Sequence, residues 1–127
     1  VGLLTNLLYS TNVNAVLRDV CSVNLGSVYE SMVAQELHAH GFALHYYDNK
    51  QRGEVDFLID DYSSLTVLPI EVKSGKDYTV HSALNHFVSN EDYGIKKGYV
   101  LSNAREVKRN GKIIYMPIYY IMFFNMK

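Results

Sequence analysis

Two short segments carry side chains that could perform metal-assisted chemistry. Residues 53–59 (Gly-Glu-Val-Asp-Phe-Leu-Ile) place Asp56 among alternating apolar residues, and residues 69–75 (Pro-Ile-Glu-Val-Lys-Ser-Gly) contain Glu71 and Lys73. Carboxylate oxygens are the ligands that hard divalent cations prefer. A lysine can lie beside an attacked phosphate or beside the nucleophilic water. Together the two segments indicate the site of a metal-dependent phosphodiesterase.

A β-hairpin with its turn near Ser63 would bring these residues together. Pairing about that centre places Asp56 opposite Glu71, and residues opposite each other on one face have Cβ atoms about 5 Å apart. Lys73 lies two residues beyond Glu71 and therefore points to the same face. The alternative is an exposed hairpin with solvated charges and a surface ion pair, because Glu-x-Lys is common in edge strands. Finding both segments at hairpin distance favours the site.

Glu30 is a third candidate, on the helix predicted over residues 24–40. The residues three, four and seven positions after it are apolar, so Glu30 lies on the apolar face of that helix. An unpaired buried carboxylate is costly, so Glu30 is expected to meet a shared cation or Lys73. The alternative is a tilted helix whose Glu30 reaches water.

The remaining pattern predicts a mixed α/β sheet flanked by helices. Asn24 or Ser27 is expected to cap the first long helix and Gly41 to end it. Val55, Phe57 and Ile59 are expected on one face of their strand, and Pro69 suggests an edge, a bulge or the beginning of a strand. The predicted elements are a short helix at 1–9, strands at 42–47, 54–59, 65–73 and 97–102, a helix at 79–89, a loop or short helix at 103–112, and a strand followed by a helix within 113–124.

Composition is that of one ordinary globular domain. The chain has 127 residues, of which 48% are hydrophobic and 20% charged, with a formal net charge of -1. The single Cys21 suits a reducing cytosol, and neither a transmembrane run nor a signal-peptide pattern is present. We expect a cytoplasmic domain without membrane contact, cut from a longer polypeptide.

Segments 26–37, 53–59 and 69–75 resemble the C-terminal domain, of unknown function, of predicted AAA+-type prokaryotic ATPases. That domain is similar to the PD-(D/E)XK, restriction-endonuclease-like superfamily. The resemblance extends from the first residues to about Ile118 and implies a restriction-endonuclease-like fold. It also implies a nuclease-like, DNA-binding core that uses Mg²⁺ or Mn²⁺, joined to an N-terminal ATPase module. The chain itself has no Gly-x-x-x-x-Gly-Lys-Ser/Thr motif, so we expect no ATP site here.

In the pattern of that superfamily, the candidate catalytic residues are Glu30, Asp56, Glu71 and Lys73. Asp56 and Glu71 would hold the metal ion. Lys76, just after Ser-Gly, is the basic residue best placed to touch a backbone phosphate.

Two other functions are kept open. The same fold could serve an attached ATPase as a non-catalytic module that binds nucleic acid or protein, or the apolar segment 118–124 could form an oligomer contact. The basic residues at 96–97 and 105–112 are interpreted as solvated loops more readily than as a phosphate track. The five histidines are scattered and do not have the spacing of a zinc site.

Overall fold

A computed structural model describes residues 25–75 and 77–125, together with the separate positions 3, 6, 7, 14 and 18. The short helix expected over residues 1–9 falls mostly outside this part of the chain. The same holds for Asn24, one of the two expected helix caps.

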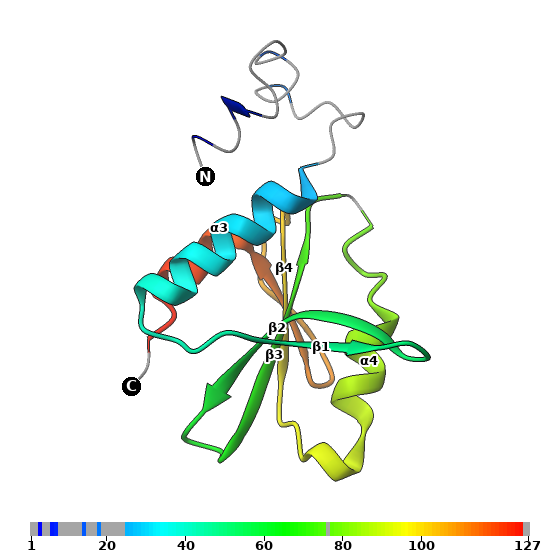
Figure 1. Cartoon of the computed structure of the whole chain (residues 1–127). Coiled ribbons are helices and arrows are strands. Elements are labelled where there is room, and N and C mark those ends of the chain that lie inside the picture. Colours follow the sequence, from blue (N-terminus) through cyan, green and yellow to red (C-terminus); the bar gives the residue numbers. More distant parts are fainter. Residues whose placement is uncertain are drawn as a thin grey trace.

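The described residues form a six-stranded mixed sheet in the order β1-β2-β3-β4-β6-β5 (Figure 1). Neighbouring strands are antiparallel from β1 to β3, parallel from β3 through β4 to β6, and antiparallel again at β5. The strands are β1 (His45–Asn49), β2 (Gly53–Asp61), β3 (Thr66–Lys73), β4 (Gly98–Ser102), β5 (Lys108–Asn110) and β6 (Ile113–Pro117). The predicted fold class, a mixed sheet flanked by helices, is confirmed.

Helices cover both faces of the sheet. Helix α3 (Gly26–Ala39) and the 3-10 helix η2 (Ile118–Phe123) lie on one face, and α4 (Ser82–Ser89), followed by the 3-10 turn η1 (Glu91–Tyr93), lies on the other (Figure 1). Each face has its own hydrophobic core. We name them the α3-side core, which includes Val33, Leu37 and Ile70, and the α4-side core, which includes Leu84 and Val100. Within the described residues, no helix combines the length and the apolar character needed to cross a membrane.

Helix α3 ends at Ala39, and Gly41 supplies its C-terminal stop, as predicted. Gly41 has a φ of 86°, and its N–H donates to the carbonyl of His38 at 2.9 Å, while the N–H of Phe42 donates to that of Leu37 at 3.0 Å. This is a Schellman motif, in which a residue of positive φ satisfies the last carbonyls of a helix. Phe42 and Leu37 both enter the α3-side core, which fixes the exit of the chain. The expected cap Ser27 lies within the helix, and Leu25 stands at the cap position without a side-chain hydrogen bond.

The predicted hairpin between β2 and β3 has the expected register. Its pairs run from Asp61 with Thr66 to Phe57 with Ile70, which centres the turn between Ser63 and Ser64. Continuing the register by one step places Asp56 opposite Glu71.

Pro69 lies inside β3 rather than at a sheet edge. Pairing of β3 with β4 starts only at Ile70, which is opposite Tyr99. Pro69 is therefore in the part of β3 that pairs with β2 alone, and its missing N–H does not interrupt the β3–β4 ladder. Pro69 is the fourth of the eight residues of β3, so the expectation that it begins the strand was wrong.

Strand β2 contains an irregularity that the sequence did not predict. His45 pairs with Leu58 and Tyr47 with Val55, so two steps along β1 correspond to three along β2. An extra residue in one strand bends it and turns its side chains to the other face. Val55 accordingly packs in the α4-side core, whereas Ile59 packs in the α3-side core, and Phe57 lies against the latter. The prediction that Val55, Phe57 and Ile59 share one face was wrong, because the bulge at Asp56 and Phe57 lies between Val55 and the other two.

The segment 103–112 is a second correction. It was expected as a loop or short helix, but Lys108–Asn110 forms β5, an edge strand that pairs with β6. All three of its residues are exposed, so no apolar alternation marks the strand, and pairing with β6 alone defines it. The predicted strand and helix within 113–124 are confirmed as β6 and η2.

Candidate active site

Asp56 lies where β2 separates from β3. The regular ladder ends at Phe57 and Ile70, and beyond it Oδ2 of Asp56 accepts a hydrogen bond from the N–H of Val72 at 2.7 Å. The carboxylate takes the position that the next main-chain carbonyl of β2 would otherwise occupy. The bulge and this bond together fix Asp56 against β3.

Glu71 and Lys73 extend from the same stretch of β3. Ile70 and Val72 belong to the α3-side core, so Glu71 and Lys73, which alternate with them, point to the opposite face. Glu71 is only 5% exposed, and its Oε1 accepts a hydrogen bond from Nζ of Lys73 at 2.6 Å. Its Oε2 is buried and has no hydrogen-bond partner among the described residues. A buried, paired Glu71 excludes the alternative of a fully solvated hairpin.

Glu30 approaches this cluster from α3. Val33 and Leu37 of its helical face are fully buried, while Glu30, nearer the start of the helix, is exposed to water. The pKa of Glu30 is nevertheless raised, first by partial burial of the carboxyl group and then by the charge of Asp56, with Lys73 acting in the opposite direction. Glu30 thus reaches water, as in the tilted-helix alternative, and also lies within electrostatic reach of Asp56 and Lys73.

The two strand carboxylates are easier to protonate than free ones. Burial raises the pKa of Asp56, while the N–H of Val72 and the Lys73 ammonium oppose that rise. Burial also raises the pKa of Glu71, the charge of Asp56 adds to it, and Lys73 opposes it. A packed pair of carboxylates that is partly desolvated behaves in this way.

The cluster can be tested for its fit to a divalent cation. Within the described residues, no group of three His, Cys, Asp or Glu side chains is arranged to hold a metal ion. A cation here would therefore use two carboxylates, Asp56 and Glu71, of which Glu71 offers the buried Oε2 that lacks a partner. Mg²⁺ is commonly held by one or two carboxylates and keeps several waters, so this donor set suits it.

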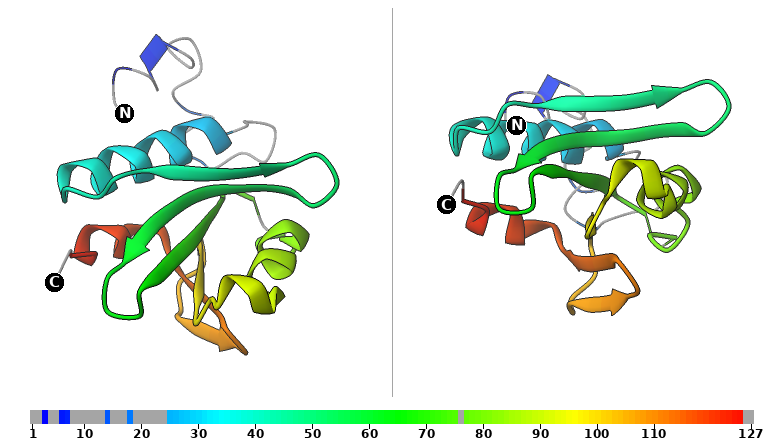
Figure 2. Two further views of the ribbon diagram at one scale, coloured as in Figure 1. Left: turned by 60° about the horizontal axis from the view of Figure 1, so that its bottom comes forward. Right: turned by 90° about the horizontal axis from the view of Figure 1, so that it is seen from below.

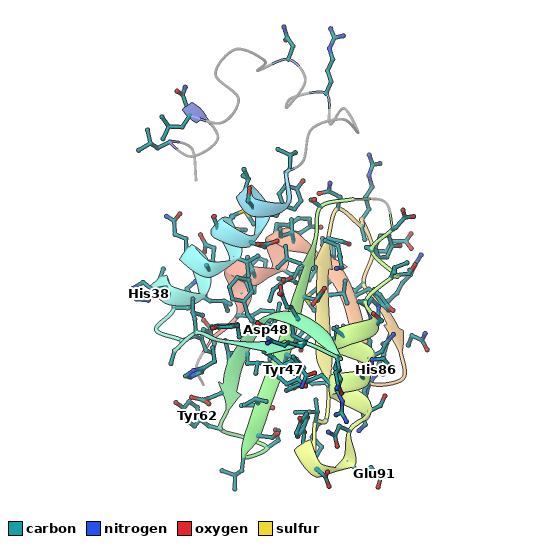
Figure 3. All side chains as sticks on the ribbon, turned by 45° about the vertical axis from the view of Figure 1, so that its right-hand side comes forward. His38, Tyr47, Asp48, Tyr62, His86 and Glu91 are labelled. Carbon is teal, nitrogen blue, oxygen red and sulfur yellow. The ribbon has the colours of Figure 1, made fainter. Side chains whose placement is uncertain are left out.

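Other residues from the sequence analysis contribute less to this site. Lys76 lies outside the described residues, so its expected phosphate contact stays a prediction. His38 on α3 and His86 on α4 lie on opposite sides of the molecule (Figure 3).

His81 is the residue that sequence reasoning missed. It is 4% exposed, and its Nε2 lies 2.7 Å from the hydroxyl oxygen of Tyr115. Burial lowers the pKa of His81, its own main chain and the Asn85 side chain oppose that, and the Lys73 ammonium lowers it further, so this pair lies near the cluster. The two partners are 34 positions apart in the chain, so no local pattern could have revealed the contact.

Fold and site together define a mixed α/β domain that carries three carboxylates and a lysine where two paired strands separate. The chain matches the family described as a domain of unknown function (DUF4143) over residues 25–121, which is most of its length, and it belongs to that family. The match begins at Leu25, later than the resemblance we expected from the first residues. No curated protein and no solved structure matches the chain.

Proposed function

We propose that this domain is a divalent-cation-dependent hydrolase of nucleic-acid phosphodiesters, related to the PD-(D/E)XK nucleases. The proposal rests on one cluster of side chains. Asp56 and Glu71 converge from two paired strands, Lys73 contacts Glu71, and Oε2 of Glu71 is a buried acceptor without a partner among the described residues. A structural ion pair would not need the second carboxylate or the unpaired oxygen.

Each side chain then has a role that follows from its position. Asp56 and Glu71 would hold the cation, and a cation held there would supply a water molecule of lowered pKa and a Lewis acid for a phosphoryl oxygen. Lys73 carries three N–H donors, so its contact with Glu71 leaves donors for a phosphate oxygen, where its charge offsets developing negative charge. Glu30, which is exposed and has a raised pKa, accepts a proton from the attacking water.

We place this hydrolase beside an N-terminal ATPase module. The support is the resemblance of segments 26–37, 53–59 and 69–75 to the C-terminal domain of predicted AAA+-type ATPases. The 127-residue chain lacks the phosphate-binding Gly-rich motif, so its own reaction is expected to proceed without ATP.

Cleavage of end-labelled DNA and RNA with Mg²⁺ or Mn²⁺ tests the proposal. Asp56→Asn should abolish cleavage, and Lys73→Gln should lower the rate about 10²–10³-fold. Glutamine is chosen over alanine because its amide can still donate to the buried Glu71. Asp60→Asn, in the same strand but near the turn, is the matched control and should cleave like the wild type.

Two outcomes would overturn the hydrolase. One is wild-type protein that binds nucleic acid without cleaving it, which would identify the non-catalytic module. The other is full activity in Asp56→Asn, which would trace the cleavage to a contaminant or to another site.

A further inference from the structure

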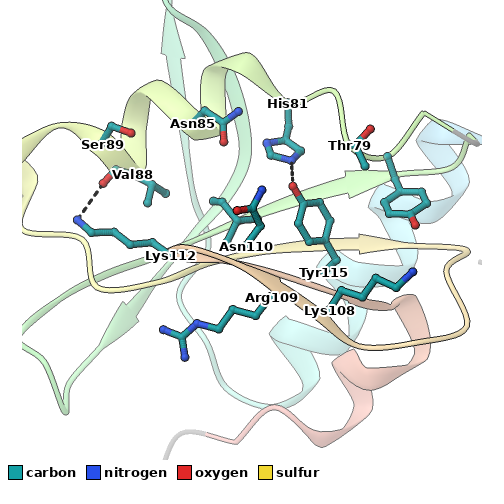
Figure 4. Close-up of a pocket in the computed structure, with 12 residues that line it drawn as sticks. Thr79, His81, Asn85, Val88, Ser89, Lys108, Arg109, Asn110, Lys112 and Tyr115 are labelled. Carbon is teal, nitrogen blue, oxygen red and sulfur yellow. Dashed lines mark hydrogen bonds between the residues drawn. The ribbon is translucent and has the colours of Figure 1, made fainter.

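A pocket of about 810 Å³ lies between α4 and the β5–β6 hairpin (Figure 4). One wall is formed by α4 and its N-cap residue, with His81 at the cap and Asn85 and Ser89 four and eight residues further on. The other wall is formed by β5, β6 and the turn between them. The volume is in the range of sites that hold small molecules. None of the four candidate catalytic residues lines the pocket, so it is a separate feature.

The pocket is positively charged although the whole chain is not. Lys108, Arg109 and Lys112 line it, and none of its described lining residues is acidic, whereas the chain has a formal net charge of -1. These cations were interpreted from the sequence as parts of a solvated loop. The β5–β6 hairpin instead gathers them on one wall opposite α4.

The hydrogen bonds of these cations leave their charge available. Arg109 donates through Nε to the carbonyl of Gly111 at 3.0 Å, and Lys112 donates through Nζ to that of Val88 at 3.3 Å. Both acceptors are neutral. Lys108 lies 3.6 Å from Glu106, but both side chains are more than half exposed, and such surface pairs are weak.

His81 provides a second and independent indication of a ligand. Its Nε2 meets the Tyr115 hydroxyl, while Nδ1 is buried and has no hydrogen-bond partner among the described residues. Figure 4 shows the ring between Tyr115 and Asn85, against the pocket. If the hydroxyl donates to Nε2, the neutral ring carries its proton on Nδ1, which is then a donor in need of an acceptor. Buried polar groups are almost always paired, so a ligand oxygen is the expected partner.

We infer that this pocket binds a phosphate group, carried either by a nucleotide or by a nucleic-acid strand. A phosphate offers several acceptor oxygens and negative charge to the three cations, and its oxygens can also accept from Asn85 and His81. Tyr78, which also lines the pocket, offers an aromatic face beside it for a base. The inference does not depend on cleavage, because the binding residues are distinct from Asp56, Glu71 and Lys73.

Binding is measured by calorimetry on the 127-residue chain in EDTA, where metal-dependent hydrolysis cannot occur. The probes are inorganic phosphate, adenosine 5′-monophosphate and a short single-stranded oligonucleotide. The test variant is the double substitution Lys108→Gln/Arg109→Gln, and the matched control is Lys96→Gln/Lys97→Gln, which removes the same charge from the other basic pair. Asn85→Leu alters the opposite wall without changing charge.

At least one probe should bind to the wild type. The Lys108→Gln/Arg109→Gln variant should weaken that binding about tenfold or more, Asn85→Leu should weaken it less, and the control should retain it. Tighter binding of the mononucleotide than of phosphate, with no gain for the oligonucleotide, identifies a nucleotide site. Tightest binding of the oligonucleotide identifies a strand.

The inference is overturned if no probe binds at millimolar concentration, or if the control variant loses as much affinity as the test variant. If the wild type binds a probe at this pocket but cleaves neither DNA nor RNA, the proposed hydrolase is overturned and the inferred phosphate site is retained.

Discussion

At the scale of single residues, the site consists of charged side chains whose partial burial lowers the stability of the fold. Asp56 and Glu71 both have raised pKa values, chiefly because burial disfavours their charged forms. Lys73 offsets this for Glu71 through a contact of 2.6 Å. Removing Lys73 without a replacement donor would leave a buried carboxylate unpaired, so the ammonium also has a structural role that the sequence alone did not indicate.

Asp56→Asn should stabilise the domain at neutral pH by about 0.5–2 kcal/mol, because asparagine keeps an oxygen for the N–H of Val72 and removes a desolvated charge. A raised folded-state pKa means that the native state binds more protons than the unfolded state above the ordinary pKa of about 3.9. The stability that wild-type Asp56 contributes is thus lost as pH rises through its folded-state pKa. The advantage of the variant should grow with pH over the same window and vanish in acid.

Urea unfolding across a pH series checks this, with Asp60→Asn as the matched control. A variant less stable than the wild type at neutral pH would mean that the negative charge of Asp56 is favourable to the fold. That result would contradict a raised folded-state pKa of Asp56.

At the scale of elements, the site depends on how β2 is held. Its extra residue stands at Asp56, and the β1–β2 hairpin extends as a long arm beside α4 (Figure 2). Gly53 begins β2 with a φ of 85°, and a Cβ there would lie 3.0 Å from the Cβ of Ala83 on α4. A small residue at this point lets the arm lie close against the helix.

Gly53→Ala should destabilise the domain more than Gly94→Ala does. Both glycines have positive φ, which costs an alanine about 1–2 kcal/mol, but only at Gly53 does the new methyl group meet another atom within 4 Å. Thermal and urea unfolding of the two variants separates backbone strain from the contact with α4. Equal losses would show that the arm does not pack against α4 in solution.

At the scale of the whole molecule, cation binding and folding should be linked. A cation that binds Asp56 and Glu71 only in the native state raises the unfolding temperature in proportion to the logarithm of its concentration. Protons compete for the same carboxylates, whose pKa values are raised, so the increase with Mn²⁺ or Mg²⁺ should be larger at about pH 8 than at about pH 6.

Thermal unfolding with and without the cation measures this shift. Asp56→Asn should lose most of it and Asp60→Asn should keep it. An identical shift in both variants would place the cation elsewhere on the molecule.

Much of this arrangement could be predicted from local sequence. The register of the β2–β3 hairpin follows from its central turn and its length, and Gly41 ends α3 because only a residue that tolerates positive φ fits there. Strand β5 could not be predicted, because three exposed polar residues carry no periodic signal. The basic pocket was missed for a different reason, because its walls come from segments far apart in the chain.

The sequence by itself determined the mixed α/β class, the hairpin that brings Asp56 toward Glu71 and Lys73, and the helix that carries Glu30, because each depends on local periodicity, turns and spacing. Tertiary structure decided the rest. The bulge that aims Asp56 at the N–H of Val72 is present only when β1 pairs with β2, and the burial of Glu71 requires cover over the face of β3 opposite α3. Desolvation and long-range pairing depend on what surrounds a residue, so spacing along the chain cannot encode them.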